Sequence, residues 1–230
     1  MSIKNVALSG NWSFKLSVFF LSSYFLFYIP VRQIFFPGHP LLWKYGHIGI
    51  WGIFLAFILL YLKSAWRQLG FSTDHIRQHC LLGVGMGILP LLFLPALDAL
   101  VAVSGMGNSE LFAGAQNIPP VQISLFENMI LIFPAPIITQ VLLSGVIGQS
   151  LLKKYNPVLA IYLGGILFTL VHLKLSLGFF ILGFVTVWLF QWTGTLYAPI
   201  LFHIGCAATE SALLQKYPRL IPLLGFFFEK

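Results

Sequence analysis

Apolar runs close to twenty residues long recur along the whole chain, with hardly a charge inside them. A helix of about 20 apolar residues spans the hydrocarbon layer of a bilayer. Only 8% of the 230 residues are Asp, Glu, Lys or Arg, whereas a soluble domain carries about 25%. Too little polar surface is left to cover a globule in water, so the sequence predicts an integral membrane protein.

Backbone amides in hydrocarbon must find their partners within the chain, which leaves helices or a closed barrel. Run length favours helices, because a barrel strand needs only about ten residues. We predict an all-α polytopic transmembrane bundle of about seven helices, forming a single integral membrane domain over residues 1–230. The candidate spans are 16–36, 47–63, 80–104, 122–152, 156–174, 177–193 and 195–216. The fourth is long and holds Pro134 and Pro136, so a kink is expected there.

Basic residues between the spans indicate an orientation with the N-terminus in the cytoplasm. Segment 64–79 is then a cytoplasmic interfacial loop and segment 105–121 an extracytoplasmic loop. The basic residues assigned to the cytoplasm are Lys4, Lys15, Lys63, Arg67, Arg77, Lys153 and Lys154, against Arg32, Lys44 and Lys174 outside. Seven spans place Lys216, Arg219 and Lys230 outside as well, against the same rule, so either a span is miscounted or the C-terminal tail re-enters.

The net charge of +7 lies at helix ends, where it suits contact with anionic lipid headgroups better than with nucleic acid. We expect the lipid bilayer as a partner, no nucleic acid, and a bacterial cytoplasmic membrane as the location.

Ionisable residues inside the spans are candidates for function, because burying one costs roughly 2.5–3.5 kcal/mol. They are Asp98, Glu127, His172, His203 and Glu210. His172 and His203 come from different spans, and a bundle can bring them together near the middle of the membrane.

Three stretches carry a resemblance to a known family: PAPIITQVLLSGVIGQSL, FTLVHL and GFVTVWLFQWTGTLYAPILFHIGCAA. In this order and spacing they resemble the core of the CPBP family, the CAAX-protease and bacteriocin-processing membrane proteins. Phe168 and His172 match the family's Phe-x-x-x-His motif, and His203 matches the first position of its His-x-x-x-Asn/Asp motif. The resemblance implies a core formed by the last four helices, about residues 122–216.

The departures from that family fall on its catalytic groups. Thr139 and Gln140 stand where the family has paired glutamates, Ser144 where it has an arginine, and Ala207 where it has the final Asn or Asp. In the family a glutamate and a histidine are thought to activate water, while the other histidine and the Asn stabilise the oxyanion. A hydroxyl or an amide has no comparable basicity. We therefore assign no catalytic residue and expect Thr139, Gln140, His172 and His203 to be polar groups of a remnant cavity.

Two glutamates could in principle replace the missing carboxylates. Glu127 precedes Thr139 by twelve residues, about 18 Å along a helix, which is too far for a simple substitution. Glu210 follows His203 by seven residues on the same helical face, about 11 Å further on. A third possibility uses Thr139 or Ser144 as nucleophile with His172 as base, although hydroxyls in membrane helices mostly bond to backbone carbonyls or neighbouring helices.

Metal-binding patterns are weak. His75 and His79 are spaced i and i+4 beside Asp74 and Cys80, but the acidic base of a metalloprotease motif is missing between them. No metal and no other cofactor is therefore expected, and His75 and His79 remain only weak candidates as ligands.

These observations favour a catalytically degenerate CPBP-like pseudoprotease that serves as a non-enzymatic subunit, scaffold, or assembly or regulatory factor. Its expected partners are transmembrane helices of another membrane protein, since Gly-rich spans allow close helix contacts. One alternative is an intramembrane CAAX-type or leader-peptide endopeptidase with an unconventional site. The other is a binder of a lipid or a small hydrophobic ligand.

Overall fold

The structure is a computed structural model that describes residues 14–61, 68–104, 124–173, 176–217 and 220–221. All regular elements in these ranges are helices, which confirms the predicted all-α class. The elements are α1 (Phe14–Ser23), η1 (Tyr24–Tyr28), α2 (Ile29–Phe35), α3 (Pro40–Tyr61), α5 (Ile76–Val103), α7 (Leu125–Ile132), α8 (Pro134–Gln140), η4 (Val141–Gly148), α9 (Gln149–Lys154), α10 (Pro157–His172), α11 (Leu177–Thr193) and α12 (Tyr197–Lys216).

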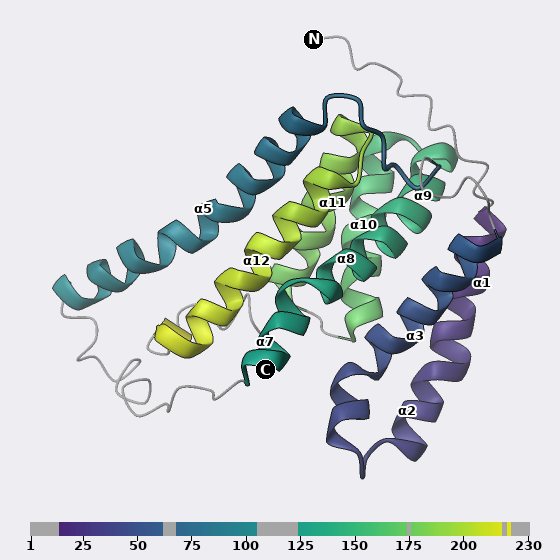
Figure 1. The fold of residues 1–230 in the computed structure, drawn as a ribbon, viewed down its shortest axis with the longest axis horizontal. Coiled ribbons are helices and arrows are strands. Elements are labelled where there is room, and N and C mark those ends of the chain that lie inside the picture. Colours follow the sequence, from purple (N-terminus) through teal and green to yellow (C-terminus); the bar gives the residue numbers. More distant parts are fainter. Residues whose placement is uncertain (1–13, 62–67, 105–123, 174–175, 218–219, 222–230) are drawn as a thin grey trace.

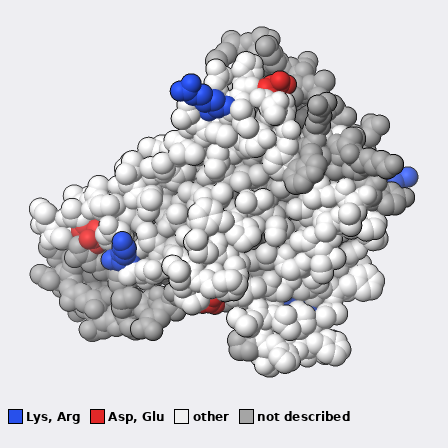
Figure 2. Space-filling view, viewed as in Figure 1, with Lys and Arg blue, Asp and Glu red and all other residues white. Residues whose placement is uncertain are grey.

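Elements that follow one another without a break form longer rods. Three rods are long and apolar enough to cross a membrane, namely Phe14–Phe35, Ile76–Val103 and Leu125–Lys154. Tyr45–Leu60, Pro157–His172 and Leu177–Thr193 are shorter apolar helices. With α12 they make seven successive helical passes through the described part of the chain (Figure 1). The predicted helical membrane bundle is confirmed, and Figure 2 shows a face that is almost free of charged side chains.

The rod Leu125–Lys154 is interrupted at Pro134, where the sequence predicts a kink. A capping box starts α7, in which the Ser124 side chain accepts from the backbone N–H of Glu127 and the Glu127 carboxylate accepts from Ser124 N. The helix stops at Phe133 because Pro134 has no N–H to continue the hydrogen-bond ladder, and α8 restarts there. A π-helical stretch, η4, then follows, and all eight of its residues are buried. This π-helical part of the rod therefore lies in the interior of the bundle.

Helix α5 lies at the edge of the bundle and packs mainly along α12 (Figure 1). Glycines permit the close approach: a Cβ on Gly205 would lie 2.4 Å from the backbone of Gly87, and one on Gly83 would lie 2.6 Å from the carbonyl of Ala198. The other faces of α5 carry exposed large side chains, among them Leu81, Leu92, Phe93 and Leu100.

Residues 68–71 enter the bundle, although the sequence predicts that segment 64–79 lies on the membrane surface. The Leu69 side chain is fully buried. The Gln149 amide donates to the carbonyl of Gln68 at 2.9 Å, and Leu196 N donates to the carbonyl of Gly70 at 3.0 Å. Gly70 has a φ of +102°, which a residue with a Cβ rarely adopts. Residues 76–79 belong to α5, whereas 62–67 and the predicted loop 105–121 fall outside the described residues.

Candidate functional site

A buried chain of hydrogen bonds joins the central rod to α12. The hydroxyl of Ser144 donates to Oε1 of Gln140 at 2.6 Å, and Nε2 of Gln140 lies 3.0 Å from Nδ1 of His203. Gln140 and Ser144 are 0% exposed, and His203 is 9% exposed. Gln140 and Ser144 are four residues apart and therefore share a helix face. We call these three residues the neutral network.

Hydrogen-bond chemistry fixes the proton positions in the neutral network. The amide oxygen of Gln140 accepts from Ser144, so its Nε2 group is the donor to His203. Nδ1 of His203 must then accept, which places the proton of the neutral ring on Nε2. His203 thus offers an N–H donor on the side of the ring away from Gln140.

His172 is a hydrogen-bond donor through Nδ1. This nitrogen lies 2.8 Å from the carbonyl of Phe168, one turn earlier in α10. A carbonyl can only accept, so Nδ1 of His172 carries a proton. The ring stacks on Phe168 with 4.5 Å between centroids and meets Trp51 edge-on at 5.4 Å.

The Phe168 ring contacts both imidazoles. Its centroid lies 5.6 Å from that of His203 and 4.5 Å from that of His172. The structure therefore gathers both predicted histidines around one aromatic ring, while the hydrogen bonds of the neutral network run from His203 alone toward Gln140 and Ser144. Thr139, beside Gln140 in the chain, is buried at 3% exposure.

Sequence reasoning missed the residues of α3 that surround His172. Trp51 is fully buried, and His47, one turn earlier, lies 5.2 Å from it and 6.4 Å from His172 between ring centroids. The indole N–H of Trp51 has no hydrogen-bond partner among the residues that the structure describes. The available signal was the i, i+4 pair of polar aromatic side chains inside an apolar run.

The two glutamates that could replace the missing carboxylates lie elsewhere. Glu127 holds the N-terminus of α7 through the capping box and accepts a hydrogen bond of 2.9 Å from the Tyr45 hydroxyl. Glu210 lines the cavity that also reaches His203, but it stands about 11 Å further along α12.

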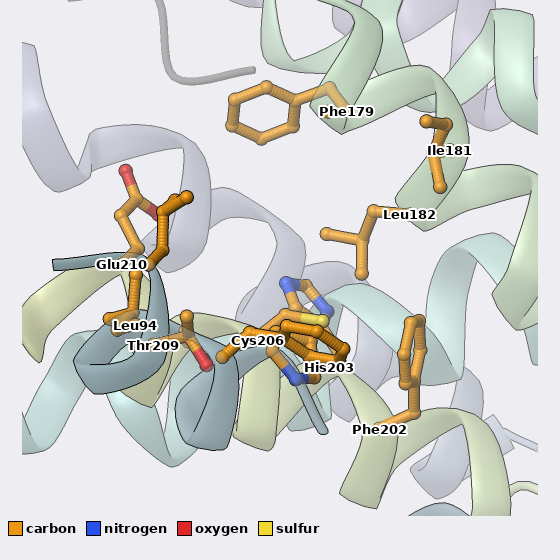
Figure 3. Close-up of a pocket in the computed structure, with 14 residues that line it drawn as sticks. Leu94, Phe179, Ile181, Leu182, Phe202, His203, Cys206, Thr209 and Glu210 are labelled. Atoms are coloured by element: carbon orange, nitrogen blue, oxygen red, sulfur yellow. The ribbon is translucent and has the colours of Figure 1, made fainter. Parts of the chain in front are cut away.

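A cavity of about 420 Å³ opens between α5, α11 and α12. Its walls are mostly apolar, with Leu94 from α5, Phe179 and Leu182 from α11, and Cys206 and Ala207 from α12. Figure 3 shows Phe179, Ile181 and Leu182 across the cavity from the α12 residues. The polar groups that line it are His203, Thr209 and Glu210. Ala207, which stands at the position of the family's final Asn or Asp, is thus a cavity residue.

His75 and His79, the weak candidates for metal ligands, make other contacts in the structure. Nδ1 of His79 lies 3.1 Å from the Thr195 hydroxyl in the turn before α12, and the ring centroids of His75 and His79 are 6.3 Å apart. Within the described ranges no group of three His, Cys, Asp or Glu residues is close enough to hold a metal ion.

Fold and site together define a helical membrane protein with a polar network enclosed between its helices. Residues 121–209 match the family of Rce1-like type II CAAX prenyl endopeptidases, which confirms the predicted CPBP resemblance over the segment that holds Gln140, Ser144, His172 and His203. Searches of curated proteins and of solved structures return no match.

Proposed function

We propose that this protein is a non-catalytic relative of the CAAX endopeptidases that serves as a scaffold, assembly factor or regulatory subunit for other membrane proteins. The observation that carries the proposal is the neutral network. The positions of one family glutamate and of the arginine hold Gln140 and Ser144, which bond to each other and to His203.

The chemistry of the network opposes hydrolysis. Water must lose a proton to attack an amide, and a tuned carboxylate or imidazole normally takes it. The Gln140 amide cannot act as a base, and its two polar atoms are engaged with Ser144 and His203. Gln140 and Ser144 stand at the positions of one family glutamate and of the family arginine. Because both charged residues are replaced together, neither charge is left buried without its partner. This pattern supports a structural role for the neutral network, in which it holds α8 and η4 against α12.

Two routes to an unconventional endopeptidase find little support. Ser144 is 0% exposed and donates its hydrogen bond to the amide oxygen of Gln140, which is too weak a base to activate it as a nucleophile. The ring contacts of His172 include His47, Trp51, Phe168 and Phe179, so that aromatic side chains surround the imidazole.

The orientation with the N-terminus in the cytoplasm is part of the proposal. The start of α1, the start of α5 and the end of α9 lie on one side of the bundle (Figure 1). These helix ends contain Lys15, Arg77, Lys153 and Lys154, and Lys154 Nζ lies 3.7 Å from the centre of the Phe14 ring. Clustered basic residues favour the cytoplasmic face. A bacterial cytoplasmic membrane as the location is part of the same proposal.

A second candidate function is binding of a lipid or a small hydrophobic ligand. It is favoured by the cavity of about 420 Å³, a volume within the roughly 300–1,000 Å³ of ligand pockets. The N–H donor of His203 gives such a ligand one polar contact.

The test is gentle solubilisation of the protein from its native membrane, followed by mass spectrometry of what stays bound. The proposal expects a partner membrane protein at a fixed stoichiometry, and full cellular function in the His172→Ala and His203→Ala variants when these fold. A polypeptide that runs alone with only a bound lipid would favour the second candidate instead.

A further inference from the structure

Two lysines end the rod Leu125–Lys154 beside the start of α1. Lys153 and Lys154 stand in the last turn of α9, and both side chains are exposed. The Nζ atom of Lys154 lies 3.7 Å from the centre of the Phe14 ring and 5.4 Å from that of Tyr155. Both distances are typical of a cation held over aromatic faces. We call Phe14, Lys153, Lys154 and Tyr155 the basic corner.

Aromatic side chains place the basic corner at the membrane interface. Trp and Tyr are enriched at the level of the lipid headgroups. The C-terminal end of α11 lies on the same side of the bundle as the end of α9 (Figure 1), and there the Trp188 and Trp192 rings are 5.3 Å apart. Trp192 is 52% exposed. A lysine at this level keeps its stem on apolar surface and its ammonium among the headgroups.

The helices around the basic corner carry no acidic side chain. The sequence has no Asp or Glu in residues 1–73 or 128–209, and α1, α9, α10 and α11 lie wholly within these two ranges. Asp74 precedes the start of α5 on the same side of the bundle, three residues before Arg77, and accepts a hydrogen bond of 2.9 Å from the Ser72 hydroxyl. An anion that meets the two lysines therefore comes from outside these helices.

The surface next to the basic corner is apolar toward the middle of the bilayer. Val18 and Phe19 follow on α1 and are 44% and 63% exposed, and Val158 in the first turn of α10 is 66% exposed. Cations above exposed apolar side chains match a molecule that has an anionic head and hydrocarbon tails. The phosphate of a membrane lipid is the anion found at this depth, and each lysine near it strengthens binding about fivefold.

We propose that the basic corner binds the phosphate of an anionic phospholipid through Lys153 and Lys154, with the acyl chains of this lipid along α1 and α10. The inference goes beyond the proposed function and does not depend on it. The bound lipid bridges α1 and α9, which are also joined by a buried hydrogen bond of 2.9 Å from the Ser17 hydroxyl to Oγ of Ser150. It thereby stabilises the packing of α1 against the rest of the bundle.

The test titrates the delipidated full chain in mild detergent with phosphatidylglycerol and measures bound lipid by native mass spectrometry. Phosphatidylcholine with the same acyl chains is the zwitterionic probe. The variants are Lys153→Gln, Lys154→Gln and the double variant. Two controls each remove one positive charge elsewhere: Arg77→Gln in α5 on the same side of the bundle, and Lys216→Gln in the last turn of α12.

The wild-type protein is expected to bind phosphatidylglycerol about 25-fold more tightly than phosphatidylcholine, because two lysines contribute about fivefold each. Each single lysine variant loses about fivefold of this preference and the double variant loses it fully. Arg77→Gln and Lys216→Gln keep it. Equal affinities of the wild-type protein for the two lipids would overturn the inference. An equal loss in Arg77→Gln would also overturn it, because the preference would then come from the net charge of that face.

Two further measurements separate a structural lipid from a loosely held anion. Phosphatidylglycerol is expected to raise the melting temperature of the wild-type protein but not of the double variant, and an equal rise in both contradicts the proposed bridge. Inorganic phosphate, added at constant ionic strength, is expected to leave the bound lipid in place. Release of the lipid by phosphate would show that the basic corner takes the free anion instead.

Discussion

The side chain of Gln140 donates a hydrogen bond of 3.0 Å to Nδ1 of His203, across two helices whose residues are 63 positions apart in the chain. In the family that the sequence resembles, a glutamate is expected at the position of Gln140. A carboxylate can only accept a hydrogen bond from the imidazole, whereas the Gln140 amide donates one to Nδ1 of His203. The proton of the neutral His203 ring is therefore on Nε2.

Removal of the Gln140 side chain is expected to destabilise the protein strongly. Gln140→Leu leaves the hydroxyl of Ser144 and Nδ1 of His203 buried without their partner, and the expected cost is about 2–4 kcal/mol. Thermal unfolding in detergent measures the change. A double-mutant cycle with His203→Phe is expected to show a coupling of about 1 kcal/mol or more. Additive effects would mean that the two side chains do not interact.

Restoring the family's charges one at a time is expected to be harmful. Ser144→Arg places a cation among fully buried groups and lowers stability by roughly 3–5 kcal/mol. Adding Gln140→Glu gives the arginine a partner one turn away and recovers part of that loss. The comparison of the melting temperatures of the single and double variants checks this. If the double variant is less stable than Ser144→Arg alone, Gln140 and Ser144 do not jointly replace a glutamate and an arginine that stabilised each other.

The contact between α5 and α12 is expected to fail when its glycines gain a side chain. A Cβ at position 205 would lie 2.4 Å from the backbone of Gly87, so Gly205→Ala must push the two helices apart. Gly85 is the matched control, because no atom lies within 4 Å of a Cβ built there. Gly205→Ala should expose α5 to added protease and lower the melting temperature. Gly85→Ala should be neutral or slightly stabilising, and equal effects of both would refute the close approach.

Leu69 is expected to hold residues 68–71 inside the bundle. Its side chain is fully buried, so Leu69→Ala should cost about 2–5 kcal/mol and make this segment accessible to protease. Leu81→Ala is the control, since Leu81 is 63% exposed on α5. If the two variants unfold at the same temperature, residues 68–71 lie on the surface, as the sequence alone suggests.

The helices could be predicted from the sequence because apolar runs, helix caps and helix-breaking Pro and Gly residues act locally. Ser176 caps α11 and Gly194 ends it with a φ of +68°, so the predicted span 177–193 agrees with α11. Helix α5 begins at Ile76, four residues before its predicted span, because polar residues can occupy the first turn of a helix that projects beyond the apolar layer. The kink before Pro134 could be predicted for the same local reason.

The contacts of the site could not be predicted because they depend on how distant helices pack. The motif positions of Gln140, Ser144 and His203 were evident, but the hydrogen bond between α8 and α12 depends on tertiary structure. The packing of Trp51 against His172 likewise joins α3 to α10. The i, i+4 pair of His47 and Trp51 marks this face of α3 in the sequence, but it does not indicate which helix the face contacts.

The most direct test of the central claim is a peptidase assay on the purified protein in nanodiscs. The substrates are a prenylated CAAX peptide and a bacteriocin leader peptide, and His172→Ala is the paired variant. The account predicts no turnover above that of the His172→Ala variant with either substrate. Reproducible cleavage by the wild-type protein that disappears in His172→Ala would contradict it.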